Sequence, residues 1–220
     1  MIDRIRSFGD SFTFGTDLSD CDGTGDSTKA SQLTWPALVS KELGLEYVTH
    51  SMGGTGNLVL VFGAMCLPQK TDFVIINWTY VDRLDNMDDF TTILPGDDTE
   101  KSNYYYKHIH SQRSDIMNNL CYIYSTHQYL KSRNIPFMST IMDRLILETD
   151  REHSATYNMQ EDIKKDITWF PGEQTFLEWS RSNNYPESEG CHPLEEAHAR
   201  AAEIMLPIVE SKINTYITTT

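Results

Sequence analysis

Two short segments near opposite ends of the chain carry residue types that could act together in acyl transfer. Gly9-Asp10-Ser11 directly follows a predicted strand over residues 2–8, so a sharp turn there can present the serine hydroxyl. A serine hydroxyl is a poor nucleophile until a neighbouring base removes its proton. Glu189 and His192 stand three residues apart, ahead of the last predicted helix, so one loop can supply both a base and the carboxylate that orients it. The pattern predicts Ser11 as nucleophile, His192 as base and Glu189 as acid.

Each segment also has a simpler structural interpretation when it is considered alone. Serine is a common N-cap residue, and Ser11 would fit that position at the start of a helix. His192 could be a solvated loop histidine beside an incidental glutamate. Glu187 is an alternative to Glu189 as the acid, although its spacing from the histidine fits less well. The catalytic interpretation therefore depends on signals elsewhere in the chain.

A third segment, Ser51–Asn57, is rich in glycine and follows a predicted strand over residues 45–49. Glycines let backbone N–H groups approach a developing oxyanion closely, which makes the Gly54 N–H a candidate donor. The segment matches neither a P-loop nor the dinucleotide-binding fingerprint, because the required lysine and the GxGxxG spacing are absent. Glycine-rich turns are also frequent in α/β folds for conformational reasons alone.

Short apolar runs alternate with longer helical patterns along the chain, which predicts a doubly wound α/β fold. The expected strands cover residues 2–8, 45–49, 73–78 and 137–141, and the expected helices cover 36–43, 57–67, 104–133 and 194–213. Ligands bind beyond the carboxyl ends of the strands in such sheets, where Ser11, the Gly53-Gly54 turn and Trp78-Thr79 all fall. No repeat or linker interrupts the pattern, so we expect one domain over residues 1–220, with cap-like insertions around 85–103 and 144–184.

In their order along the chain, these segments resemble the sequence blocks of the SGNH/GDSL hydrolases. Gly9–Gly15 is similar to block I, which holds the nucleophile, Gly54–Asn57 to block II, and Glu189–Pro193 to block V. The resemblance implies a three-layer α/β/α sandwich with a central, mostly parallel sheet of flavodoxin-like topology. It also implies a serine esterase or deacetylase that uses a Ser-His-acid triad and an acyl-enzyme, with no metal or cofactor. The N–H groups of Ser11 and Gly54 would hold the oxyanion.

Two positions depart from the family pattern. The acid of block V is usually aspartate, whereas Glu189 stands at that position here. Block III is usually Gly-x-Asn-Asp, but this chain has Asn77–Arg83 after the third strand, which resembles a divergent branch found in phage and bacterial genomes. The side-chain donor of the oxyanion hole would then be the hydroxyl of Thr79 or an amide of Asn57 or Asn77, or the site would rely on backbone donors.

The excess of acidic residues disfavours some classes of binding partner. The chain has 18 basic and 32 acidic residues, a net charge of −14, which argues against nucleic acid and membrane surfaces as partners. We expect a small-molecule or glycan ester as the substrate, and the sequence is compatible with a homo-oligomer. The four cysteines lack the paired spacing of a zinc site, so no metal is expected.

No segment resembles a signal peptide or is apolar over enough residues to span a membrane, which predicts a cytoplasmic or virion-associated protein. The alternative to an enzyme is a non-catalytic binding or structural domain, for example of a viral particle, that keeps the fold with an altered site. The changed block III and the glutamate at position 189 favour this alternative. The joint presence of Ser11 and His192 favours the enzyme.

Overall fold

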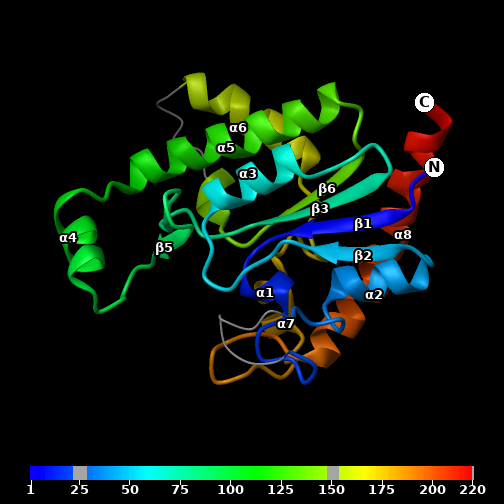
Figure 1. Cartoon of the computed structure of the whole chain (residues 1–220), viewed down its shortest axis with the longest axis horizontal. Helices are drawn as coiled ribbons and strands as arrows, with labels where there is room; N and C mark the ends of the chain where they lie inside the picture. Colours follow the sequence, from blue (N-terminus) through cyan, green and yellow to red (C-terminus); the bar gives the residue numbers. More distant parts are fainter. Residues whose placement is uncertain (22–28, 148–153, 220) are drawn as a thin grey trace.

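The computed structural model describes residues 1–21, 29–147 and 154–219 and is built around a central parallel sheet (Figure 1). The strands are β1 (Arg4–Phe8), β2 (Glu46–Thr49), β3 (Asp72–Trp78) and β6 (Phe137–Ile141), in the order β2-β1-β3-β6. All three strand pairings are parallel, and the register places Ser7 beside Thr49 on one side and beside Ile75 on the other. The predicted α/β fold with a mostly parallel central sheet is confirmed.

Strand β3 forms the middle of the sheet because both of its faces are covered. All seven of its residues are buried, as expected for a parallel strand with helices on both sides. Alternate side chains enter opposite cores: Phe73 and Ile75 face one helical layer, and Val74 and Ile76 face the other. The apolar run that marks this strand in the sequence therefore reflects burial on two faces.

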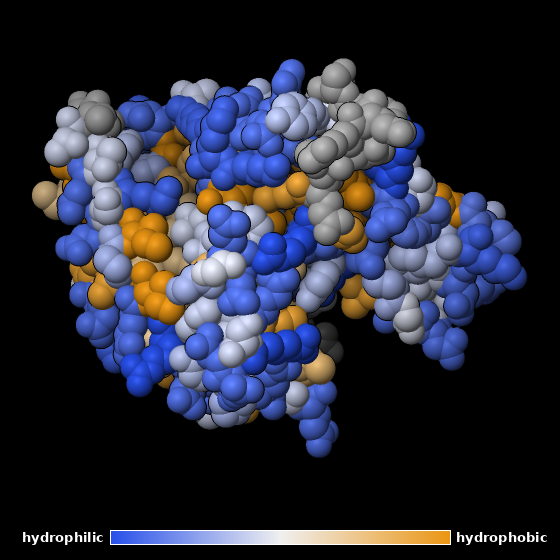
Figure 2. Space-filling view, turned by 180° about the vertical axis from the view of Figure 1, so that it is seen from behind, coloured by the Kyte–Doolittle hydropathy of each residue, from blue (hydrophilic) through white to orange (hydrophobic). Residues whose placement is uncertain are grey.

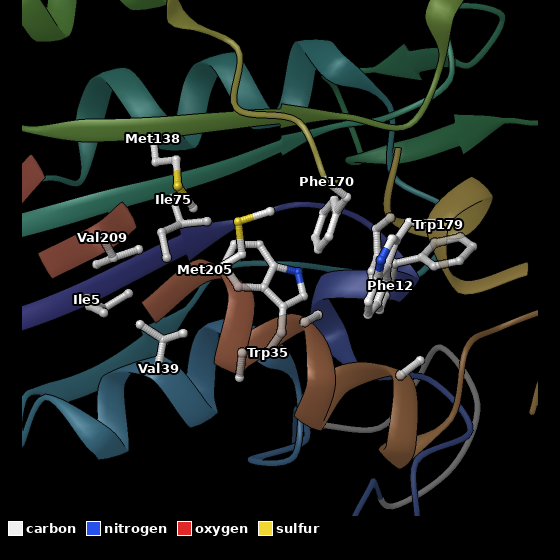
Figure 3. Close-up of a cluster of buried hydrophobic side chains, with 14 of the residues drawn as sticks. Ile5, Phe12, Trp35, Val39, Ile75, Met138, Phe170, Trp179, Met205 and Val209 are labelled. Atoms are coloured by element: carbon white, nitrogen blue, oxygen red, sulfur yellow. The ribbon is translucent and has the colours of Figure 1, made fainter. Parts of the chain in front are cut away.

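Two layers of helices complete the sandwich. Helices α2 (Trp35–Glu42) and α8 (Glu195–Thr219) cover one face, and α3 (Asn57–Cys66), α5 (Gln112–Ser132) and α6 (Ser154–Asp166) cover the other (Figure 1). Figure 3 shows the first core, in which Trp35 of α2 and Met205 and Val209 of α8 pack beside Ile5 of β1. The three-layer α/β/α architecture is thus as predicted.

The region after β3 differs from the prediction. Residues 85–103, expected to be irregular, contain most of a short antiparallel hairpin, β4 (Leu84–Asn86) and β5 (Thr91–Ile93), and the start of α4 (Glu100–His108). The single helix predicted over 104–133 is instead two helices, α4 and α5. The predicted helix is interrupted at Ser111, because the side chain of Ser111 caps the start of α5 by accepting the Ser114 N–H at 3.4 Å. Figure 1 shows this hairpin and α4 projecting from one side of the sandwich.

The segment 144–184, predicted as a cap-like insertion of short helices, does contain short helices. They are a 3₁₀ turn (Arg144–Leu147), α6 and α7 (Phe176–Ser182), with residues 148–153 outside the described range. Apolar residues of this segment enter both cores: Ile146 and Ile163 on the α5 side, and Phe176 and Trp179 on the α8 side. The segment is therefore an integral part of the packing of the sandwich.

Hydrophilic residues dominate the face of the molecule seen in Figure 2, and apolar residues emerge there in smaller separate areas. Among the described residues, none of the helices combines the length and the apolar character that a membrane crossing would require.

We expect one buried histidine to make the stability of this fold depend on pH. His198 of α8 is 1% exposed and its Nδ1 accepts the Trp35 N–H at 3.2 Å. Burial lowers the pKa of His198 from 6.5 to about 3. Below about pH 6.5, His198 therefore binds a proton in the unfolded chain but not in the folded chain. The free energy of unfolding should fall as the pH decreases from about 6.5 toward 3. At about 1.4 kcal/mol per pH unit, the loss at pH 5 is roughly 2 kcal/mol.

Urea unfolding at pH 7.5 and pH 5 measures this effect in the native chain and in His198→Asn. The asparagine offers an acceptor for the Trp35 N–H but does not titrate, so the variant should lose less stability between the two pH values. Equal losses in both proteins would exclude His198 as the source.

Candidate active site

Ser11 lies at the first position of a four-residue helix, α1 (Ser11–Phe14), directly beyond the carboxyl end of β1. Asp10 caps this helix: its Oδ1 accepts the Phe12 N–H at 3.1 Å, and its side chain is fully buried. The turn requires glycine at position 9, because a Cβ there would come within 2.3 Å of the Thr13 Oγ1. The Gly-Asp-Ser sequence thus forms a tight turn that presents the serine.

His192 and Asp17 complete a hydrogen-bonded chain that begins at Ser11. The Ser11 Oγ lies 2.9 Å from the His192 Nε2, and the His192 Nδ1 lies 2.7 Å from the Asp17 Oδ2. The side chains of His192 and Asp17 are 18% and 35% exposed, so the chain sits at the surface. Serine, imidazole and carboxylate are in the order and at the distances that general-base activation of a hydroxyl requires.

Asp17 reaches the imidazole because the loop after α1 turns back on itself. Its φ is 71°, in the left-handed region that aspartate adopts more readily than most residues. The Ser19 N–H donates to the Glu195 Oε1 at 2.8 Å, which ties this loop to the start of α8. The Ser188 hydroxyl donates to the Asp17 Oδ2 at 2.6 Å. These hydrogen bonds from Ser188 and His192 lower the pKa of Asp17 below its ordinary value, so its charge is favoured.

The prediction that Glu189 orients the imidazole is wrong for this structure. Glu189 is exposed, and within the described residues it makes no hydrogen bond or ion pair, whereas Asp17 occupies the His192 Nδ1. Glu187, the alternative acid, is paired with Arg181 at 2.9 and 3.0 Å. The chain at Gly190 passes so close that a Cβ there would lie 3.0 Å from the Asp17 Oδ2. Asp17 therefore fills the space beside the imidazole.

The loop of His192 is held by its own backbone and by one aromatic contact. The Ser188 N–H donates to the His192 carbonyl at 2.9 Å, and the His192 N–H donates to the Ser188 Oγ at 3.2 Å. Phe12 of α1 meets the imidazole edge to face, with 5.2 Å between ring centroids. Ser188 thus contacts both the histidine and its carboxylate.

The glycine-rich turn lies against the nucleophile turn, as predicted. The Met52 N–H donates to the Gly9 carbonyl at 3.2 Å, which joins the two turns directly. Gly54 has a φ of 74°, which favours glycine. Within the described part of the chain, neither the Ser11 N–H nor the Gly54 N–H donates a hydrogen bond. Both remain available to an oxyanion.

Comparison with known proteins finds similarity in structure only. No protein-family model matches the chain, and no curated protein sequence matches it significantly. TesA aligns over 95% of this chain and 99% of its own, at 14% identity and a TM-score of 0.55. An acetyl xylan esterase (Est2A) from the rumen bacterium Butyrivibrio proteoclasticus aligns over 96% of this chain and 64% of its own, at 14% identity and a TM-score of 0.55.

A carbohydrate esterase family 2 enzyme with a carbohydrate-binding domain, from Corynascus thermopiles (Myceliophthora fergusii), aligns over 96% of this chain and 66% of its own. The identity is 13% and the TM-score is 0.52. This chain therefore spans about two thirds of each carbohydrate esterase chain, but nearly all of TesA. The chain has the SGNH/GDSL hydrolase fold.

The predicted side-chain donors of this candidate site are engaged differently from the prediction. Thr79 is fully buried, and its hydroxyl donates to the Asp10 Oδ2 at 2.7 Å. Both hydrogens of the Asn57 Nδ2 are used, on the Thr79 carbonyl at 3.0 Å and on the Asn119 Oδ1 at 2.6 Å. Asn77 is 3% exposed and accepts the Thr140 hydroxyl. Thr79 and Asn57 therefore stabilise the framework of this candidate site and are not free to donate to an oxyanion.

Two charged residues at this candidate site, Arg83 and Asp17, had no function predicted from the sequence. The Arg83 Nη1 donates to the Asp10 Oδ2 at 3.1 Å and to the Thr55 carbonyl at 2.9 Å. Asp17 stands in a polar loop with several other aspartates, so its position in the sequence gave no signal. Over the described ranges, no group of three or more His, Cys, Asp and Glu side chains is arranged to hold a metal ion.

Proposed function

We propose that this chain is a serine hydrolase that cleaves carboxylic esters through an acyl-enzyme on Ser11. The observation that carries the proposal is the continuous chain Ser11 Oγ–His192 Nε2–Asp17 Oδ2, with His192 in contact with both partners at 2.9 and 2.7 Å. Several solved structures that share the fold are esterases by name, which supports the same reaction class.

In the proposed reaction, His192 takes the proton of the Ser11 hydroxyl as the oxygen attacks the ester carbonyl. The Asp17 carboxylate holds the Nδ1–H of the imidazole and stabilises the imidazolium that forms. The imidazolium then gives its proton to the departing alcohol, which leaves an acyl group on Ser11. A water molecule, deprotonated by the same His192, attacks this acyl-enzyme. The bond between the acyl carbon and the Ser11 oxygen then breaks, the imidazolium returns its proton to this oxygen, and the acid is released.

In this proposal, backbone N–H groups stabilise the negative charge that develops on the carbonyl oxygen. The Ser11 and Gly54 N–H groups have no other acceptor among the described residues. A donor that is fixed before the reaction needs no reorganisation when the oxyanion forms. Because Thr79 and Asn57 are engaged elsewhere, neither of them adds a side-chain donor to the proposed oxyanion hole.

For the substrate, we propose a short acyl group, such as acetate, on a neutral small molecule or glycan. Two of the structures with a TM-score above 0.5 are named as an acetyl xylan esterase and a carbohydrate esterase. The net charge of −14 disfavours polyanionic substrates and nucleic acids. A panel of p-nitrophenyl esters from acetate to octanoate, together with acetylated xylan, would define the acyl length.

The second candidate is a non-catalytic binding or structural domain with the same fold. The observation that favours it is the loss of the block III side-chain donor, since two of the three predicted replacements, Thr79 and Asn57, are engaged in buried hydrogen bonds. Against it stands the formed contact between Ser11 and His192, which a merely structural role would not need.

Labelling with a fluorophosphonate separates the two candidates. This reagent phosphonylates a serine whose hydroxyl is activated by a base, and peptide mapping by mass spectrometry locates the adduct. We expect one adduct on Ser11, none in Ser11→Ala, and much slower labelling in His192→Ala. Absence of an adduct in the folded native chain would favour the non-catalytic domain.

A further inference from the structure

One nitrogen of Arg83 connects the two turns that supply the proposed oxyanion donors. Its Nη1 lies 3.1 Å from the Oδ2 of Asp10, the residue before Ser11. The same nitrogen lies 2.9 Å from the carbonyl of Thr55, the residue after Gly54. Arg83 itself follows β3, on neither turn, so it fixes the position of one turn relative to the other.

This connection is largely buried. The Asp10 side chain is fully buried and that of Arg83 is 13% exposed, so their ion pair is shielded from solvent. Asp10 also accepts the Thr79 hydroxyl and caps α1 through the Phe12 N–H, so all three interactions depend on one carboxylate. The guanidinium stacks on the Tyr80 ring, with 4.9 Å between its central carbon and the ring centroid.

Arg83 is better suited to position donors than to donate to the oxyanion itself through this nitrogen. Nη1 carries two hydrogens, and both are used, on Asp10 and on Thr55. The buried Asp10 carboxylate also offsets most of the positive charge that an oxyanion could feel. What Arg83 controls is the separation of the Ser11 and Gly54 N–H groups, which must converge on one oxygen atom.

We propose that Arg83 is a positioning residue that sets this separation, in place of the side chain that block III would supply. The inference rests on the proposed ester hydrolysis. Misplacement of catalytic groups by about 1 Å can lower the rate by about 100-fold, even when the substituted residue does not touch the substrate. The loss should appear in kcat, because the oxyanion exists only after the attack on the carbonyl.

The test compares Arg83→Met and Arg83→Lys with the matched control Arg6→Met. Arg6 also forms a buried pair with an aspartate, its Nε lying 2.8 Å from the Asp72 Oδ2, and its Nη1 lies 2.6 Å from the His50 Nε2. Unlike Arg83, it bonds to neither Asp10 nor Thr55 among the described residues. Each variant is assayed for kcat and KM on p-nitrophenyl acetate across pH 6 to 9, and its melting temperature is measured. Ser11→Ala is included in the same series.

We expect Arg83→Met to lower kcat by about 100-fold, with KM within about threefold of the native value and the shape of the pH profile unchanged. Arg83→Lys should recover about tenfold of this loss, because an ammonium can donate to Asp10 and Thr55 but lacks the planar fork. Arg6→Met should lose stability and keep its kcat. If Arg83→Met does not fold, a reduced kcat in Arg83→Lys carries the test.

A native kcat in folded Arg83→Met, or an equal fall of kcat in Arg6→Met, would overturn the positioning role. An increase in KM alone would also overturn it, because it would assign Arg83 to substrate binding. Failure of the underlying function looks different: hydrolysis by Ser11→Ala would then equal that of the native chain.

Discussion

Replacing Ser11 with alanine is expected to lower kcat for p-nitrophenyl acetate by roughly 10⁴- to 10⁶-fold, to near the background rate. In the proposed mechanism the hydroxyl oxygen forms the acyl-enzyme, and within the described residues the hydrogen-bond partner of this hydroxyl is the His192 Nε2 at 2.9 Å. Alanine removes the oxygen and leaves the cap of α1 intact, since Asp10 supplies that cap. The variant should therefore fold normally and bind substrate without turning it over.

The matched control is Ser125→Ala on the exposed side of α5, where the hydroxyl bonds, among the residues that the structure describes, to carbonyls of its own helix. It should keep the native kcat and melting temperature. Equal hydrolysis by Ser11→Ala, Ser125→Ala and the native chain would contradict nucleophilic catalysis by Ser11.

Burial on both faces of the sheet explains why the sequence predicts the architecture well. Strand β3 contains the apolar run Phe73–Ile76 because helices cover it on both sides, and β6 begins and ends where predicted, at Phe137 and Ile141. These segments are specified locally, by residue type and length. The alternation with helices then limits the topology to a parallel sheet with helices on both faces.

Structure that depends on a single capping side chain is harder to predict. The break between α4 and α5 comes at Ser111, and neither neighbour is a proline or glycine. The β4–β5 hairpin has strands of only three residues, too short for an alternating pattern to be distinguished from a polar loop. Its position is fixed by a tertiary contact, in which the Asp85 carboxylate accepts the Gly56 N–H at 2.8 Å and the Val59 N–H at 3.0 Å.

The site was predictable where a residue type and its position in a turn are sufficient. Ser11 and His192 lie in contact, and the Gly54 turn lies against the nucleophile turn. The functions of Thr79 and Asn57 were not predictable, because a sequence shows which side chains can donate but not which donors are already used. Thr79 has one hydroxyl hydrogen, and Asp10 takes it.

The acid was mispredicted because the carboxylate nearest to His192 in the sequence is not the one nearest to it in the structure. Glu189 is three residues from His192 but exposed, whereas Asp17 is 175 residues away in the chain and 2.7 Å away in the structure. The left-handed backbone of Asp17 and the close passage of the chain at Gly190 make this contact. Neither feature has a signature in a loop rich in aspartate, glycine and serine.

Asp17→Asn and Glu189→Gln together decide which carboxylate acts with His192. Asp17→Asn should lower kcat by about 10³- to 10⁴-fold, because an amide can donate to Nδ1 and favour the tautomer whose Nε2 already carries a proton. Such an imidazole does not accept the Ser11 proton. Glu189→Gln should stay within about threefold of the native kcat, since Glu189 is exposed and has no partner among the described residues. Steady-state kinetics on p-nitrophenyl acetate measures both.

The pH dependence sharpens this comparison. Hydrogen bonds from Ser188 and His192 lower the pKa of Asp17, so its carboxylate is charged across the neutral range and any stability it contributes is lost only as the pH falls through that lowered value. The deficit of Asp17→Asn should therefore persist across pH 6 to 9. The opposite result would be an inactive Glu189→Gln and an active Asp17→Asn. It would mean that the His192 loop rearranges and that the acid is Glu189, at the spacing of block V, and not Asp17.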